Sequence, residues 1–202
     1  MEQITFLRHG RSSADDEGVF ESRYDSELTA VGRQQAGELA AIWKDDDFRK
    51  YKKIITSPLK RAVTTAEIFS DVLEIAVVTS DLLLEIDAGK LCGMDKKEGM
   101  RKFPPPRFAN PYDRIVMGSG ESEAQLHARA LLAVEHILNM DDDSYLVISH
   151  GMILNAILRS IFAIPMPVNQ DGVIFRFGDV GYMDVMYDEK KHLWKVLRFR
   201  NS

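Results

Sequence analysis

Two short apolar stretches that each end in histidine and then glycine constrain the fold of this chain more than any other feature. Residues 4–7 lead through an arginine to His9, and residues 145–149 lead directly to His150. In an open α/β sheet, ligands collect beyond the carboxyl ends of the strands, so two such turns can bring both imidazoles to one place. A single turn of this kind is usually only a bend with a solvated histidine. The repeated pattern favours a shared site where the two strands end.

The first of these turns also carries a permanent cation. Arg8 stands next to His9, and Gly10 lets the backbone bend sharply and approach a ligand closely. Histidine is partly neutral near physiological pH and can attack through one ring nitrogen. Arginine holds phosphate through paired hydrogen bonds and keeps its charge. The combination indicates an anion site suited to phosphate chemistry.

Length and composition are those of one ordinary globular domain. The chain has 202 residues, of which 45% are apolar and 28% charged, and we treat residues 1–202 as a single domain. A net charge of −5 disfavours a protein that binds nucleic acid or an anionic membrane over a broad surface. Any anion site must therefore be a local cluster of positive charge.

Hydrophobic periodicity divides the rest of the chain into alternating strands and helices. Further strands are expected at 53–56, within 75–86, and at 173–177, 182–187 and 193–199. Helices are expected after an N-cap at Thr29, from Pro58 onward, and over 121–139 and 152–162, with a loop at 13–27. This order predicts an α/β fold, a three-layer αβα sandwich around a mostly parallel central sheet.

Two further candidate site residues lie in the middle of the chain. Arg61 falls on the first turn of the helix after Pro58, near the carboxyl end of the preceding strand. Glu85 stands among leucines and isoleucine, where it is either an outward-facing strand residue or a carboxyl group in an apolar pocket. In a pocket, loss of water would raise its pKa and make it a useful proton donor.

Residues 87–119 form the least regular segment and are predicted to be a cap insertion. The segment contains three consecutive prolines and seven basic residues against four acidic ones, including Lys96 and Lys97. Long insertions in compact domains are often lids over a site, although an ordinary surface excursion is the alternative. If the basic excess faces the pocket, substrates with a second anionic group should be preferred.

The order and spacing of five motifs resemble those of the histidine phosphatase superfamily, the phosphoglycerate-mutase-like enzymes, over nearly the whole chain. The motifs are Arg8-His9-Gly10, Ser57-Pro58-Leu59-Lys60-Arg61-Ala62, residues 84–89, Gly120-Glu121-Ser122 and Ser149-His150-Gly151. The resemblance implies catalytic roles for His9 as nucleophile, Arg8 and Arg61 as phosphate ligands, and Glu85 as acid and base. It also makes His150 a catalytic residue, which, if protonated, could donate a hydrogen bond to the phosphate oxygens. It also implies phosphate contacts from Ser12 and from the backbone N–H groups near Gly151 and Met152.

This resemblance implies a metal-independent phosphomonoesterase, a histidine acid-type phosphatase, that hydrolyses small phosphate esters through a phosphohistidine on His9. Neither a metal nor a cofactor is expected. Two alternatives stay open: a cofactor-dependent phosphoglycerate-mutase-type phosphotransferase, and a catalytically silent binding or scaffold protein. Mutases typically follow the glutamate with arginine, histidine and tyrosine, whereas Ile86-Asp87-Ala88 stands here.

The chain departs from the family pattern at two places. Seven residues after Arg8, family members commonly have asparagine, but here Asp15 stands there. A carboxylate would repel phosphate unless it is protonated, paired with a cation or turned away. Family members often have a five-residue pattern here: glycine, any residue, tryptophan, glutamate and glycine. Residues 89–93 lack this pattern, so the family's substrate preference cannot be assigned to this chain from them.

The remaining expectations concern the surroundings of the protein. The single cysteine, Cys92, fits a reducing compartment, and no apolar run approaches the roughly 18 to 20 residues that span a bilayer. The N-terminus also lacks the basic and apolar regions of a secretory signal. We therefore expect a cytoplasmic protein with a small-molecule phosphate ester as partner, no nucleic-acid or membrane partner, and an edge strand compatible with a homodimer.

Overall fold

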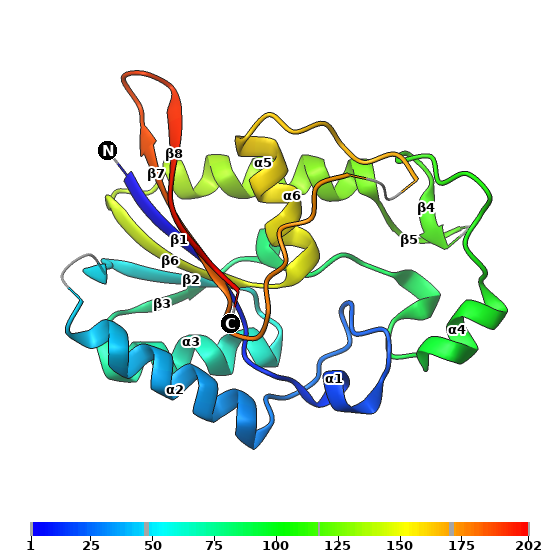
Figure 1. Ribbon diagram of the computed structural model, residues 1–202, viewed down its shortest axis with the longest axis horizontal. Coiled ribbons are helices and arrows are strands. Elements are labelled where there is room, and N and C mark those ends of the chain that lie inside the picture. Colours follow the sequence, from blue (N-terminus) through cyan, green and yellow to red (C-terminus); the bar gives the residue numbers. More distant parts are fainter. Residues whose placement is uncertain (1, 47–48, 117, 170–171, 202) are drawn as a thin grey trace.

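The fold is built on a mixed sheet whose central strands are parallel. The computed structural model describes residues 2–46, 49–116, 118–169 and 172–201. Within this part of the chain, six strands pair in the order β3-β2-β6-β1-β7-β8 (Figure 1). Their bounds are β1 Glu2–Arg8, β2 Lys53–Thr56, β3 Val77–Thr79, β6 Ser144–Ser149, β7 Tyr182–Asp188 and β8 Leu193–Arg200. Strands β3, β2, β6 and β1 run parallel, while β7 and β8 are antiparallel to their neighbours. The mostly parallel sheet is confirmed.

Helices cover both faces of this sheet (Figure 1). The helices are α2 Ala30–Lys44 and α3 Lys60–Leu73 on one face, and α5 Glu123–Leu138 and α6 Gly151–Ile161 on the other. Strand β6 is buried along its whole length, with Tyr145 and Val147 packed toward α5 and α6, and Leu146 and Ile148 toward α2 and α3. A strand covered on both faces needs no polar alternation, which is why its sequence is a continuous apolar run. The three-layer αβα arrangement is therefore confirmed.

The helices begin close to the predicted positions because local capping signals fix their ends. Thr29 accepts a hydrogen bond from the Gly32 N–H at 3.0 Å, and Ser122 forms a reciprocal capping box with Gln125. The sequence predicts Pro58 in the first turn of its helix, but this residue lies two positions before α3 begins.

No helix in the described residues is long and apolar enough to cross a membrane.

The predicted strand at 173–177 is wrong. These residues run without regular structure along α6, where the Asn155 amide bonds to both the N–H and the C=O of Phe175, at 2.7 and 2.9 Å. Arg159 donates to the carbonyl of Val173. Strand β1, where the site lies, already has β6 and β7 as neighbours, and side chains of α6 satisfy the backbone of this segment instead.

The strand predicted within 75–86 is much shorter than that window. Only Val77–Thr79 pair with β2, and a 3-10 turn follows at Asp81–Leu83. Leu83 turns into the apolar core beneath α5 and α6. Glu85 consequently lies on an irregular segment beyond the sheet rather than on a strand.

Residues 13–27 are not wholly a loop, because α1 spans Ser13–Glu17. The Asp15 carboxylate accepts the Ser12 N–H at 3.0 Å, which stabilises the first turn, and Gly18 ends the helix at a φ of 70°. The rest of the segment passes the carboxyl ends of the strands, where the carbonyls of Ser22 and Tyr24 accept from Arg61.

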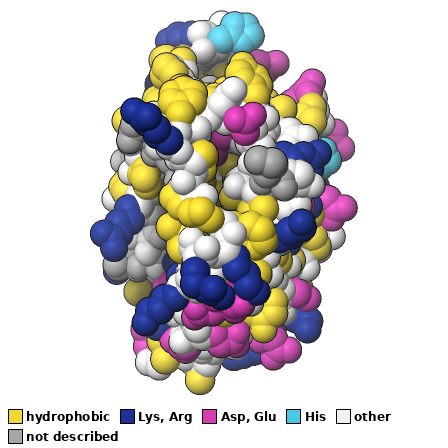
Figure 2. All heavy atoms as spheres, turned by 90° about the vertical axis from the view of Figure 1, so that its right-hand side faces the viewer, with side chains coloured by type: hydrophobic (Ala, Val, Ile, Leu, Met, Phe, Trp, Pro, Cys, Tyr) yellow, Lys and Arg dark blue, Asp and Glu magenta, His cyan; other side chains and the backbone are white. Residues whose placement is uncertain are grey.

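The predicted cap segment forms one end of the molecule (Figure 1). It contains α4 Lys96–Lys102 and β4 Arg114–Val116, which forms a hairpin with β5 Ser119–Ser122 at the C-terminal boundary of the segment. A small apolar cluster forms around Leu91 and Val116, with Phe20 packed against it. Figure 2 shows basic, acidic and apolar side chains intermixed over this end of the molecule rather than one broad basic patch. Its role as a lid stays a prediction.

Candidate active site

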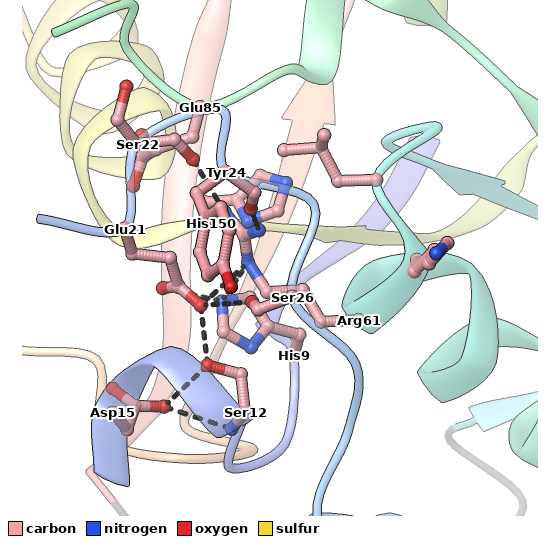
Figure 3. Close-up of polar contacts among 12 residues, drawn as sticks. His9, Ser12, Asp15, Glu21, Ser22, Tyr24, Ser26, Arg61, Glu85 and His150 are labelled. Carbon is pink, nitrogen blue, oxygen red and sulfur yellow. Dashed lines mark hydrogen bonds and ion pairs between the residues drawn. The ribbon is translucent and has the colours of Figure 1, made fainter. Parts of the chain in front are cut away.

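The two strand-His-Gly turns meet at one edge of the sheet. Strands β1 and β6 are neighbours in parallel register, with Arg8 opposite Ser149, and the His9 N–H donates to the Ser149 carbonyl at 3.0 Å. The rings of His9 and His150 therefore lie with their centroids 5.0 Å apart, and both side chains are buried. Figure 3 shows both rings beside Arg61 and Glu85. The predicted convergence of the two imidazoles is confirmed.

An open cleft of about 270 Å³ lies beside this pair. Its walls come from the end of β1, the segment after α1, the irregular segment before the cap, the start of α6 and the chain before β7. The lining residues are Arg8, His9, Glu21, Glu85, Gly151, Met152, Asn155 and residues 174–177. Among the described residues, no group of three or more His, Cys, Asp or Glu side chains is placed to hold a metal ion.

Hydrogen bonds fix the tautomer of His9. Its Nδ1 lies 2.7 Å from the Gly10 carbonyl oxygen, which only accepts, so Nδ1 carries the proton. The lone pair is then on Nε2, which accepts from Arg61 Nε at 3.2 Å. Burial, followed by the charges of Arg8 and Arg61, holds the pKa of His9 well below its usual value. The ring is therefore neutral at physiological pH, and its nucleophilic nitrogen is unprotonated and hydrogen-bonded to Arg61.

Arg61 is fully buried and closely tied to the segment that follows α1. Its Nη1 donates to the Tyr24 carbonyl at 2.7 Å and its Nη2 to the Ser22 carbonyl at 2.8 Å. Its Nε also lies 3.1 Å from an oxygen of Glu21. Burial lowers the pKa of Arg61, and the charge of Glu21 acts in the opposite direction.

Arg8 is held between two carboxylates. Its Nη1 donates to Asp179 at 2.7 Å and its Nη2 to Asp15 at 3.3 Å. Burial alone would raise the pKa of Asp15, but the Ser12 N–H and then the charge of Arg8 outweigh it, so the pKa lies below its usual value. Asp15 is thus ionised and paired with a cation, one of the three outcomes expected for a carboxylate at this position.

Glu85 lies at the N-terminus of α6. Its Oε1 accepts the N–H groups of Ile86 and Ile153, and its Oε2 accepts that of Met152 at 3.1 Å. Burial raises the pKa of Glu85, although these N–H groups and Arg61 act against it. The predicted shift is confirmed. The Met152 N–H serves Glu85 here, rather than the phosphate contact that the sequence suggested.

The two remaining predicted phosphate ligands also lie at the site. Ser12 is buried, and its hydroxyl is within hydrogen-bond distance of Asp15 and Glu21. Gly151 lines the cleft as the first residue of α6.

His150 is neutral rather than protonated in this structure. Burial and then the charge of Arg61 hold its pKa well below the usual value. Its Nε2 shares a hydrogen bond of 2.8 Å with the Ser57 hydroxyl, while its buried Nδ1 has no partner among the described residues. One hydrogen-bonding position of the ring is therefore unused next to His9.

Besides Arg176, which lines the cleft, sequence reasoning missed three charged residues of the site. Asp179 pairs with Arg8, Glu21 contacts Arg61, and Arg129 of α5 donates to the carbonyls of residues 82, 84 and 85 while it binds Glu121 in a two-bond ion pair. One signal was available for Asp179. If the strand at 182–187 had been predicted to pair antiparallel with β1, the residues just before that strand, including Asp179, would have been placed next to Arg8. No local pattern marks Glu21 or Arg129.

The two buried neutral histidines make folding stability dependent on pH. Unfolded histidines take up protons near pH 6.5 while the folded ones do not, so the unfolded state binds more protons and stability falls as the pH falls. We expect the free energy of unfolding to decrease from pH 7 to pH 5.5 by up to about 2.7 kcal/mol per pH unit for the two groups. The raised pKa of Glu85 makes the folded state bind more protons, which opposes this slope. It does so only at pH values between 4.5 and the pKa of Glu85 in the folded protein.

Urea unfolding at pH 7.5, 6.5 and 5.5 measures this slope. The double variant His9→Asn, His150→Asn should flatten it, whereas His192→Asn, at an exposed position, should not. An equal slope in the double variant and the parent protein would contradict the assignment.

Comparison with known proteins supports what the geometry indicates. The family model of the histidine phosphatase superfamily, branch 1, matches residues 4–197. A probable phosphoglycerate mutase GpmB of Yersinia enterocolitica is 31% identical over 172 residues, covering 82% of this chain and 77% of that protein. A metal-independent phosphoserine phosphatase of Arabidopsis thaliana is 30% identical over 164 residues, with 79% and 68% covered.

Solved structures share the fold. YhfR of Bacillus stearothermophilus superposes with a TM-score of 0.82 at 23% identity, covering 96% of this chain and 94% of that one. A mycobacterial glucosyl-3-phosphoglycerate phosphatase in complex with VO3 has a TM-score of 0.80 at 21% identity, with 100% of both chains covered. The match along almost the whole sequence, together with the paired histidines, shows that this chain belongs to branch 1 of the histidine phosphatase superfamily, as an enzyme of the phosphatase type.

Proposed function

We propose that this protein is a metal-independent phosphomonoesterase that works through a phosphohistidine on His9. The observation that carries the proposal is the state of His9: buried, neutral, with its Nδ1 proton directed to Gly10 and its Nε2 lone pair directed toward the arginine-lined site. A histidine that must attack phosphorus needs an unprotonated nitrogen next to groups that hold the phosphate.

In the first step, Nε2 of His9 attacks phosphorus and the bond from phosphorus to the ester oxygen breaks. Arg8 and Arg61 would hold the phosphate oxygens, with further hydrogen bonds from His150, Ser12 and the start of α6 at Gly151, where charge builds up. The departing oxygen needs a proton, and Glu85, whose pKa is raised by burial, would supply it. The product alcohol then leaves the cleft.

In the second step, water attacks the phosphohistidine. Glu85, now ionised, takes a proton from this water, so the same carboxyl group acts first as acid and then as base. The bond between phosphorus and Nε2 breaks, inorganic phosphate is released and His9 returns to its neutral state. The two arginines supply positive charge in both steps, so the scheme assigns no step to a metal ion.

The mutase alternative is favoured by one observation, the similarity to a protein named as a probable phosphoglycerate mutase. A mutase would pass the phosphoryl group from His9 to an acceptor that already carries a phosphate. It must therefore keep water away from the phosphohistidine. The open cleft beside His9 favours hydrolysis. The scaffold alternative is weaker, because the five side chains proposed for catalysis lie together at one sheet edge.

The substrate is proposed to carry an anionic group besides its ester phosphate. Arg176 lines the cleft and makes no ion pair within the described part of the chain, whereas Lys96 and Lys97 are exposed on α4 and do not line it. Phe175 and Phe177 add an apolar wall. Similarity to the phosphoserine phosphatase supports the same class of small, doubly anionic phosphate esters. A cytoplasmic location and a homodimer stay predictions.

A panel of phosphate esters, assayed with EDTA present, tests this function. We expect phosphate release without added metal and a lower KM for esters that carry a carboxylate or second phosphate. Arg176→Ala should raise the KM of those esters about tenfold and leave singly anionic aryl phosphates unchanged. Lys97→Ala serves as the matched basic control. Activity that is abolished by EDTA and restored by a divalent cation would refute metal independence.

A further inference from the structure

The carboxylate of Glu21 lies beside Ser12, His9 and Arg61, the residues proposed to bind and attack the substrate phosphate. The residue belongs to the segment between α1 and α2, and only 20% of its side chain is exposed. Its Oε1 accepts from Ser26 at 2.9 Å and from the Ser12 hydroxyl, and it lies 3.1 Å from Arg61 Nε in an ion pair. Figure 3 shows this carboxylate directed toward Arg61 and Ser12 rather than out of the site.

These donors are the groups that the proposed reaction needs for phosphate. Arg61 and Ser12 are the proposed ligands of the phosphate oxygens, and Oε2 of Glu21 lies 3.8 Å from Nε2 of His9. A phosphorus atom poised for attack has to stand about 3 to 3.5 Å from that nitrogen. The carboxylate and the phosphate cannot both occupy this space.

The same segment also ties up the rest of the Arg61 guanidinium. Its two terminal nitrogens donate to the carbonyls of Tyr24 and Ser22, while its Nε donates to Nε2 of His9 and lies within ion-pair distance of Glu21. Arg8 is likewise bound to Asp15 and Asp179. Arg8 and Arg61 are thus both paired with protein groups in this structure.

We propose that Glu21 is an internal competitor of the substrate phosphate, and that its withdrawal with residues 22–24 sets the affinity of the site. The inference rests on the proposed function, because it takes His9 as the nucleophile. The apparent Kd of a ligand equals its intrinsic Kd divided by the fraction of molecules in the competent state. A carboxylate that holds the site closed therefore raises KM and the apparent Kd. A phosphate ester binds only after its own oxygens replace those of Glu21 at Arg61 and Ser12.

Orthovanadate binding and p-nitrophenyl phosphate kinetics of Glu21→Gln test the proposal. Glutamine keeps the volume of the side chain and removes the charge that competes. We expect the vanadate Kd and the KM to fall at least about tenfold, with kcat within about threefold of the parent value. Glu27→Gln, an exposed carboxylate of the same segment, should change neither. Glu21→Ala should also lower the vanadate Kd and the KM.

Each other result has a definite meaning. Unchanged Kd and KM in both Glu21 variants would overturn the competitor role while leaving the phosphatase function in place. A loss of kcat of about 100-fold or more with unchanged vanadate binding would overturn it in favour of proton transfer by Glu21. Tight vanadate binding by Glu21→Gln without turnover in either protein would support the competitor and refute the phosphatase. No vanadate binding by any variant would refute both.

Discussion

Replacing His9 by alanine should lower kcat/KM for phosphate esters by at least about 10⁴-fold, because the variant has no group that can form the covalent intermediate. In the parent protein, Nε2 of His9 combines an available lone pair with a neighbouring arginine. Alanine removes this nitrogen, but Arg8 and Arg61 stay and can still hold phosphate.

Rapid quenching during turnover of an aryl phosphate, followed by mass spectrometry, measures the intermediate directly. The parent protein should show an acid-labile phosphoryl adduct on His9 that forms and decays at the rate of turnover. The alanine variant should show none. His192→Ala, an exposed histidine of the β7–β8 connection, is the matched control and should behave like the parent protein. An adduct on another residue, or full activity of His9→Ala, would refute the mechanism.

Glu85→Gln should separate substrates by their leaving groups. An alkyl ester needs a proton on the departing oxygen, so its kcat/KM should fall by about 10² to 10⁴-fold. An aryl ester leaves readily without one, so its kcat/KM should change by less than about tenfold. Because the same carboxyl group activates water in the second step, the phosphohistidine should accumulate with the aryl substrate.

Steady-state kinetics on matched alkyl and aryl esters, together with the quenched adduct assay, check this result. Glu17→Gln, an exposed carboxylate on α1, is the control and should leave both substrates unaffected. Glutamine also weakens the contacts with the N–H groups of Met152 and Ile153, so vanadate binding should be measured alongside. Equal losses on both esters, matched by loss of vanadate binding, would make Glu85 a structural residue.

The sequence by itself determined the fold class and the main site residues. Each depends on a signal within a few residues: an apolar run that ends in histidine and glycine, a hydroxyl group that caps a helix, an arginine one turn into a helix. In a parallel sheet these local signals carry positional information, because the carboxyl ends of all parallel strands lie on one edge. The local sequence alone therefore predicts that His9, His150, Arg8 and Arg61 lie together.

The tertiary structure alone decided which strands form and how the charges pair. Residues 173–177 have strand-like composition, but they lie along α6, and their backbone bonds to the side chains of Asn155 and Arg159. Asp179 and Glu21 carry no local pattern, and their partners depend on which distant segments meet Arg8 and Arg61. Strand composition is a local preference, whereas a free sheet edge and the partner of a buried charge are properties of the whole packed chain.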